Sequence, residues 1–368
     1  MSNLREQKGR RITAVLLTVF ALAALIVAVR NDAGLYQTTI ARVMRAETAY
    51  DRSETGPGGQ TEMHYAQTLA LRILNGPDAG RTATAQNAYA QSLVASEKYA
   101  AGDDLFVGLS EESGVLTAVV TGEKRDVIVA LLAGLFVAGM IWVARWRGIL
   151  TVASFLFNLG VFCVCMKFYM DGVPLSRLRM VMICAFLIST LLLAGGLTKK
   201  ALGAILASLI TLILTALLYR AAVALAGEPP YELMDYIFVP EDLEDIFLAG
   251  VLIGCLGAVM DVAITICSAV SELVRTAGPL SYREIAEAVR EIGNDIMGTM
   301  VGVLLFSYLS GSLPIILVKV MNGYSFGSMV RFHALFELIR FLAGSIGIVL
   351  AIPVSGVIAA ALLARRRA

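Results

Sequence analysis

Eight long runs of apolar residues, separated by charged segments, restrict the fold of this chain more than any other feature. Most runs have the ~20 residues that a helix needs to cross the hydrocarbon core of a bilayer, and the longer ones can tilt. The chain is 58% hydrophobic and only 16% charged, far from the composition of an average soluble domain. We therefore predict an α-helical integral membrane protein with about eight transmembrane helices. The predicted spans are Ile12–Val29, Val127–Ala144, Ile149–Tyr169, Met180–Leu197, Ala201–Leu225, Ile246–Val270, Asp295–Val318 and Leu335–Leu363.

The first run follows a basic segment, so we interpret residues 1–30 as a cytoplasmic basic end and a first transmembrane helix. Arg5, Lys8, Arg10 and Arg11 precede the run. A secretory signal peptide has the same layout, but the AVRNDAG stretch that follows is a poor match to a cleavage site. An uncleaved signal anchor is the better interpretation, and cleavage stays an open alternative.

Residues 31–125 are the soluble region of the chain, in which charged and turn-forming residues return. Short runs suited to strands alternate with turn sequences such as NGPDAG and AGDD. Five such strands predict a small extracytoplasmic β-rich domain, a barrel of the OB or SH3 kind. The stretch Ala83–Tyr99 is also compatible with a helix. The predicted strands are Leu35–Arg45, Met63–Leu74, Arg81–Ala88, Asp104–Leu109 and Val115–Thr121.

Residues 126–368 contain the remaining runs, which predict a seven-helix membrane domain, and their loops indicate its orientation. With a cytoplasmic N-terminus, most basic loop residues lie inside, whereas the loop 226–245 on the other side has seven acidic residues and no basic one. Arg177, Arg179, Lys319 and Arg331 go against this trend. On balance the positive-inside rule predicts a bacterial cell membrane protein with both termini in the cytoplasm and residues 31–125 outside.

The sixth run carries an aspartate in its middle, which costs free energy in a bilayer and therefore needs a reason. Asp261 lies in the stretch GAVMDVAITI. At helical spacing it shares one narrow stripe of small and polar side chains with Gly254, Gly257, Thr265 and Ser268.

Similar stripes occur in the next two runs, where glycines spaced four or three residues apart permit close helix approach. The stripes consist of Asp295, Gly298, Thr299 and Gly302 in the seventh run, and of Glu337, Arg340, Gly344 and Gly347 in the eighth.

Two interpretations of these stripes stay open. In the first, they face one another and line a substrate or ion path, in which Asp261 and Asp295 bind protons or cations and Arg340 is a counter-charge to Asp261. In the second, the glycines are helix contacts, Glu337 and Arg340 pair near a span end, and Asp295 caps the start of its helix. We favour function for Asp261, which has no local partner, and structure for Glu337, and we leave both open for Asp295.

The segment Ser281–Gly293 links the sixth and seventh runs and has the periodicity of an amphipathic helix. Ile285 and Val289 recur at helical spacing among charged residues. Ser281, with Glu284 three residues later, matches the capping-box pattern. We predict a short helix on the cytoplasmic face that either couples the two aspartate-bearing spans or serves as a packed connector, the interpretation we prefer.

Sequence motifs of catalysis and cofactor binding are scarce, and we predict no enzyme activity. The chain has no HExxH, P-loop, CxxC or GxGD motif. Its five cysteines lie within apolar runs and its two histidines are far apart, so we predict no disulfide framework, metal site or cofactor. A net charge of +1 gives no basic field that would indicate a nucleic acid partner.

Four stretches of the membrane region resemble the YibE/YibF-like family of bacterial multi-pass membrane proteins. They are LTKKALGAILASLI, GCLGAVMDVAITICSAVSEL, EIGNDIMGTM and ELIRFLAGSIGIVLAIPVSGVIAA. The resemblance covers Val127–Leu363 well and the N-terminal part more loosely. The chain departs from the family pattern at Asn294, where members have an arginine, and at Val301–Val303, where they have polar residues. The family has no established biochemical activity, so the resemblance implies an architecture rather than a reaction.

The function that we predict from these features is that of a permease-like transporter of unspecified substrate that uses intramembrane carboxylates. The alternative is a non-transporting membrane scaffold or sensor whose extracytoplasmic domain binds an envelope partner. The expected partners are the lipid bilayer and either a second copy of the chain or an envelope protein.

Overall fold

The computed structural model describes residues 2–55, 59, 61–112, 114–229, 231, 243–278 and 280–363, with the side chains of 2–15, 112, 194, 332 and 363 left aside. It divides into two compact units, Met1–Arg145 and Trp146–Ala368. The helix Asp126–Ala144, which the sequence-based division places in the membrane domain, clusters with the first unit.

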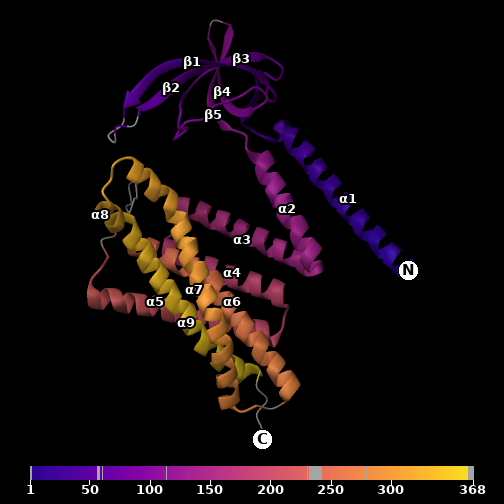
Figure 1. Ribbon diagram of the computed structural model, residues 1–368, viewed down its shortest axis with the longest axis vertical. Coiled ribbons are helices and arrows are strands. Elements are labelled where there is room, and N and C mark those ends of the chain that lie inside the picture. The colour runs from indigo at the N-terminus through magenta and orange to yellow at the C-terminus, as the bar shows by residue number, and fades with distance from the viewer. Residues whose placement is uncertain are drawn as a thin grey trace. The chain divides into compact units, whose positions relative to one another are not determined.

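The first unit consists of two helices and a β-barrel inserted between them (Figure 1). The strands close into a barrel in the order β1-β2-β3-β5-β4, in which the β3–β5 pair is parallel and the other pairs are antiparallel. The prediction of a β-rich domain is confirmed, and the helical alternative for Ala83–Tyr99 is wrong. The elements are α1 (Ser2–Arg30), η1 (Ala33–Leu35), β1 (Thr39–Thr55), β2 (Thr61–Ile73), β3 (Thr82–Ala90), β4 (Asp104–Glu112), β5 (Val115–Glu123) and α2 (Asp126–Ala144).

The barrel core follows from the alternation of apolar and polar residues along the strands. In β2, Leu69, Leu71 and Ile73 are buried, whereas the residues between them are exposed. Leu105 and Val107 contribute in the same way from β4. A slip of one residue would turn each set outward, so this pattern fixes the register.

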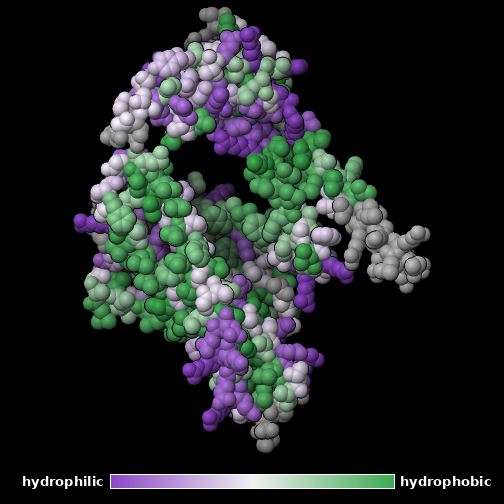
Figure 2. Space-filling model, viewed as in Figure 1, coloured by the Kyte–Doolittle hydropathy of each residue, from purple (hydrophilic) through white to green (hydrophobic). Residues whose placement is uncertain are grey.

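The second unit is a helical bundle (Figure 1). The longest buried face belongs to α6, which packs against α4, α5, α7 and α9. Towards the outside the helices present apolar side chains, as a bilayer requires (Figure 2). The elements are α3 (Trp146–Met170), α4 (Leu175–Gly195), α5 (Lys199–Ala226), α6 (Leu243–Ala277), α7 (Tyr282–Met321), α8 (Phe326–Met329), the π-helical turn η3 (Val330–Ala334) and α9 (Leu335–Leu363).

Seven helices within the described residues are long and apolar enough to cross a membrane, namely α2 to α7 and α9. A multi-pass membrane protein is therefore confirmed. In α1 the described apolar stretch is Leu16–Arg30, which is shorter than a full span. The eighth span, over Ile12–Val29, stays a prediction.

The predicted connector and the predicted seventh span are one continuous helix, α7, with 40 residues. At 1.5 Å per residue it is about 60 Å long, which exceeds the ~30 Å hydrocarbon core. The predicted capping box is present, because Ser281 accepts from the Glu284 backbone and the Glu284 side chain accepts from Ser281. Asp295 lies well inside this helix, so its predicted role as a helix cap is wrong.

Candidate functional site

The polar stripe predicted on the sixth span is the exposed line of helix α6. Gly254, Gly257, Asp261 and Thr265 are exposed, and Ser268 is half-buried. The remaining faces of the helix middle are occupied by buried apolar side chains of the bundle core. Sequence spacing therefore identified the one face of this helix that its own bundle leaves open.

Within the described part of the chain, no hydrogen bond or ion pair is formed by the Asp261 carboxylate. The stripe is covered at one end, because a Cβ on Gly254 would collide with the hydroxyl of Tyr308 from α7. One turn further, a Cβ on Gly257 would meet nothing within 4 Å. The open part of the stripe thus runs from Gly257 past Asp261 to Thr265.

The stripe predicted on α7 is also open. Asp295, Gly298 and Thr299 are exposed and Gly302 is half-buried. A Cβ on Gly298 or Gly302 would meet no atom within 4 Å, so these glycines make no close helix contact in this chain. The Thr299 hydroxyl donates to the carbonyl oxygen of Ile296 at 2.8 Å.

The stripe on α9 faces the bundle interior instead. A Cβ on Gly344 would lie 2.8 Å from Leu304 of α7 and 3.1 Å from Cys255 of α6. A Cβ on Gly347 would lie 2.8 Å from the hydroxyl oxygen of Thr215 in α5. These two glycines therefore allow α9 to approach three other helices closely.

Arg340 pairs with its neighbour on α9 and not with the aspartate of α6. Its Nη1 lies 2.6 Å from Glu337 Oε1, and its guanidinium stacks 5.0 Å from the ring centroid of Phe247. A Cβ on Gly250 would lie 3.6 Å from Arg340 Nε. Gly250 and Asp261 are separated by eleven positions, or about 16 Å along the helix, which is beyond the reach of an arginine. The predicted Arg340–Asp261 pair is not formed.

Buried polar groups that the sequence reasoning missed lie deeper in the bundle. Ser208, Thr211 and Thr215 of α5 and Ser355 of α9 are at most 1% exposed. The Thr215 hydroxyl donates to the carbonyl oxygen of Thr211. Their helical spacing on α5 is a pattern that the sequence does contain. It does not single them out, because serine and threonine are common at contacts between transmembrane helices.

A GxSxG sequence at Gly323–Gly327 is explained by local structure. Ser325 is the N-cap of α8, and its hydroxyl oxygen accepts from the backbone of Ser328 at 3.2 Å. A nucleophile elbow of this sequence pattern lies between a strand and a helix. Here the segment joins two helices, so the motif carries no catalytic geometry.

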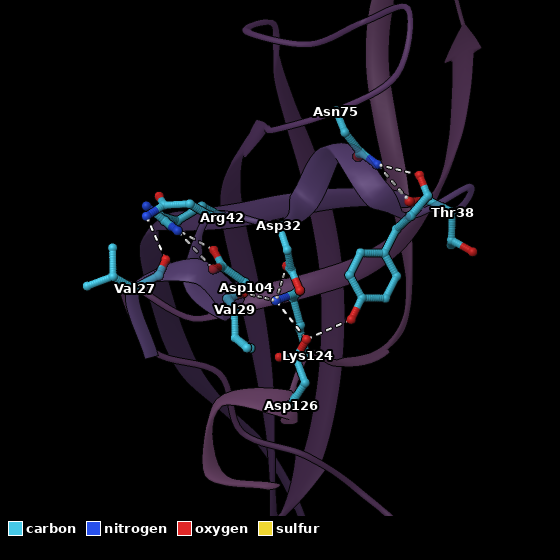
Figure 3. Close-up of polar contacts among 11 residues, drawn as sticks. Val27, Val29, Asp32, Thr38, Arg42, Asn75, Asp104, Lys124 and Asp126 are labelled. Carbon is cyan, nitrogen blue, oxygen red and sulfur yellow. Dashed lines mark hydrogen bonds and ion pairs between the residues drawn. The ribbon is translucent and has the colours of Figure 1, made fainter. Parts of the chain in front are cut away.

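The first unit contains a buried lysine that the sequence reasoning also missed (Figure 3). Lys124 lies between β5 and α2, and its side chain is 3% exposed. Its ammonium pairs with Asp32 Oδ1 at 2.7 Å and Asp126 Oδ2 at 2.8 Å, and donates to the carbonyl oxygen of Val29 at 2.7 Å. It also lies 5.4 Å from the ring centroid of Tyr36, whose hydroxyl donates to Asp126 at 2.7 Å.

This Lys124 cluster joins the end of α1, the turn after it, the last strand of the barrel and the start of α2. Burial opposes the charge, but hydrogen bonds to Asp126 and Asp32 outweigh it and raise the pKa of Lys124 above its ordinary value. The lysine is therefore charged at physiological pH and holds the barrel to both helices of its unit.

Two further contacts fix the start of β1 (Figure 3). Arg42 of β1 binds Asp104 of β4 with two hydrogen bonds, at 2.7 and 2.8 Å. The Asn75 amide accepts from the backbone of Ile40 at 2.6 Å and donates to the carbonyl oxygen of Thr38 at 3.0 Å. Together they tie the start of β1 to β4 and to the turn that follows β2.

Family models match both parts of the chain. A model described as YibE/F-like protein matches residues 132–365, and one described as YibE/F family N-terminal domain matches residues 34–122. The chain belongs to the YibE/F-like family. The matches include the barrel and every helix from α3 to α9, so the resemblance noted in the four membrane stretches is confirmed and extends to the β domain. No curated protein and no solved structure matches this YibE/F-like chain significantly.

In the described part of this YibE/F-like protein, no three His, Cys, Asp or Glu side chains lie close enough together to hold a metal ion. Asp261 is one exposed acidic group in apolar surroundings, and among the described residues its carboxylate has no hydrogen-bond or ion-pair partner.

Proposed function

We propose that this YibE/F-like protein is a permease-like transporter in which Asp261 binds the transported or coupling cation, including a proton. The observation that carries the proposal is the open line Gly257, Asp261 and Thr265 on a helix that is otherwise buried. A carboxylate in the middle of a span faces a solute path far more cheaply than it faces lipid.

The geometry supports a specific division of roles. The Asp261 carboxylate is the charged group, and the hydroxyl of Thr265, one turn further on the same line, is a second oxygen ligand. Ser268 extends the line towards the end of α6. Asp295 and Thr299 form a second open line on the next helix, and the Glu337–Arg340 pair is neutralised within α9.

We further propose eight spans, both termini in the cytoplasm and the barrel outside the bacterial cell membrane. The support comes from the basic residues in the loops assigned to the inside and from the acidic loop assigned to the outside. Residues 230 and 232–242 of that acidic loop lie outside the described residues.

The transport proposal is tested by cation flux through the purified full-length protein in liposomes. A membrane potential is applied, and a trapped pH-sensitive dye or a sodium-sensitive dye reports entry. We expect the wild type to give a cation flux above that of empty liposomes. In Asp261→Asn the flux should fall at least about tenfold, because losing ~1.4 kcal/mol of interaction with the cation already lowers binding tenfold. Glu272→Gln, on the same helix but in an exposed pair with Arg275, is the control and should retain flux.

Equal flux in the wild type and Asp261→Asn would contradict this role of the aspartate. Absence of flux for both ions in the wild type would favour the alternative function below.

A specific observation favours the alternative, a scaffold or sensor whose barrel binds an envelope partner. Tyr50, Tyr65 and Tyr89 form a ladder across β1, β2 and β3, with ring centroids 6.3 and 5.2 Å apart. Tyr50 is 60% exposed. We infer that the barrel is of the OB kind from its five strands, which close in the order β1-β2-β3-β5-β4. OB barrels bind ligands on the face of their second and third strands, which here carries Tyr65 and Tyr89. Under this alternative Tyr50→Ala impairs function and Asp261→Asn does not.

A further inference from the structure

A cavity of about 360 Å³ lies between the start of α7 and the second half of α9. Its wall is mostly apolar and includes Ile285, Val289, Ile352 and Val357. The volume is in the range of small-molecule sites, ~300–1,000 Å³. None of the stripe residues discussed above lines this cavity, so it is separate from the proposed solute path.

Close contacts beside the cavity hold its two walls together. A Cβ on Gly356 of α9 would lie 2.8 Å from Val289 of α7. A Cβ on Gly293 of α7 would lie 2.5 Å from Ile352 of α9. The two helices therefore cross tightly at these glycines, and the cavity is a fixed feature of the crossing rather than a loose gap.

The rim of the cavity carries one uncompensated positive charge. Arg290 lines the cavity together with Tyr282 and Asn294, and it is exposed. Among the described residues no acidic group lies within ion-pair distance of Arg290. Among the described residues, the arginines at the end of α6 and the first turn of α7 are paired, Arg275 with Glu272 and Arg283 with Glu287.

The position of the cavity along α7 corresponds to the edge of a bilayer. The charged side chains at the end of α6 and the start of α7 gather at one end of the second unit (Figure 2). From Ile296 onward α7 is dominated by apolar residues. The cavity lies between these two regions, where headgroups meet acyl chains.

We propose that this cavity binds an anionic phospholipid, with one acyl chain in the apolar groove and the phosphate on Arg290. The Asn294 amide and the Tyr282 hydroxyl are further hydrogen-bond donors for the headgroup, and both line the cavity. A soluble anion would gain nothing from the apolar wall. A zwitterionic lipid such as phosphatidylcholine brings a choline cation next to its phosphate, which offsets the attraction of that phosphate to the arginine, whereas an anionic lipid brings none.

Native mass spectrometry of the full-length protein in detergent tests the proposal. The probes are phosphatidylglycerol and phosphatidylcholine with identical acyl chains, and glycerophosphoglycerol, which has the anionic headgroup without chains. We expect the wild type to bind phosphatidylglycerol about fivefold more tightly than phosphatidylcholine. This ratio corresponds to the attraction between one basic residue and an anionic lipid surface. We expect glycerophosphoglycerol to bind at least tenfold more weakly.

Three variants separate the headgroup contact from the acyl chain contact. Arg290→Gln should abolish the preference for phosphatidylglycerol, whereas the matched control Arg283→Gln should keep it. Ala286→Phe, which fills the cavity without changing charge, should weaken both lipids.

A wild type without headgroup preference would overturn the proposal, as would an equal loss in Arg283→Gln and Arg290→Gln. Unchanged lipid binding in Ala286→Phe would show that the acyl chain binds elsewhere. Tight binding of glycerophosphoglycerol would assign the site to a free phosphate compound.

Discussion

At the scale of single residues, two charged groups in apolar surroundings differ in how they are stabilised. Lys124 has three oxygen partners within 2.8 Å, and two of them are carboxylates. Asp261 has no partner among the described residues, and it is exposed on a helix face. A buried charge that is fully paired is a structural device, whereas an unpaired charge in a span calls for a ligand or a path.

Replacing Lys124 with methionine should loosen the junction between the barrel and its two helices. The change leaves Asp32 and Asp126 without their cation, and removing one partner of a buried pair costs about 3 kcal/mol. Amide hydrogen exchange of the full-length protein should therefore accelerate at the end of β5 and the start of α2. Arg52→Met, in an exposed pair with Asp51, is the control and should change exchange little.

The same substitution has a pH signature. The pKa of Lys124 is raised in the folded state, so its contribution is complete below its ordinary value of 10.5 and is lost as pH rises through the folded value. The difference in unfolding temperature between the wild type and Lys124→Met should be constant near neutral pH and shrink in strongly alkaline solution. It should also shrink in strong acid, because the ion pair with Lys124 is lost once Asp126 is protonated. A difference that shrinks on acidification alone would argue against the charged lysine as the stabilising group.

At the scale of helices, glycines that look alike in sequence have different surroundings. Gly347 lies against Thr215, where an added methyl group has no room, whereas Gly298 faces open space. Gly347→Ala should therefore lower the free energy of unfolding by about 1–3 kcal/mol through overpacking. Gly298→Ala should be neutral or slightly stabilising, since alanine is the better helix former.

Thermal unfolding of the full-length protein in detergent measures both changes. Equal destabilisation by the two variants would contradict the structure of the single chain and would indicate that a second copy covers the α7 stripe.

Sequence periodicity predicted most elements but could not say which faces meet. The strands and the spans α2 to α7 and α9 could be predicted from the sequence, because pleat alternation and the length of an apolar run are local properties. The sequence did not predict that Ser281–Gly293 and the seventh span form one helix. Charged residues interrupt the apolar run there, while the backbone helix continues through Gly293. The local pair Glu337–Arg340, one of the two interpretations left open by the sequence, is present. The stacking of Arg340 on Phe247 depends on how α9 crosses α6, which no local pattern encodes. The Lys124 cluster joins residues more than ninety positions apart and gave no local signal either.

At the scale of the whole molecule, the number of spans between two segments decides whether those segments lie on the same side of the membrane. The barrel precedes α2, and five spans, α2 to α6, separate it from the end of α6. If each of the five helices crosses the membrane, this odd number of crossings puts the barrel and the α6–α7 link on opposite sides, whatever the absolute orientation. Under the orientation that we propose from the positive-inside rule, the barrel is on the outer side.

Cysteine labelling of intact cells tests both parts of this argument. Ser110→Cys in the exposed part of β4 should react with a membrane-impermeant maleimide added outside. Thr276→Cys, exposed at the end of α6, should react only after the cells are opened. The wild type is the control for the natural cysteines, all of which lie in the spans α3, α4 and α6. Labelling of both positions from outside would contradict the odd number of crossings, whereas labelling of Thr276→Cys alone would keep that number and reverse the orientation.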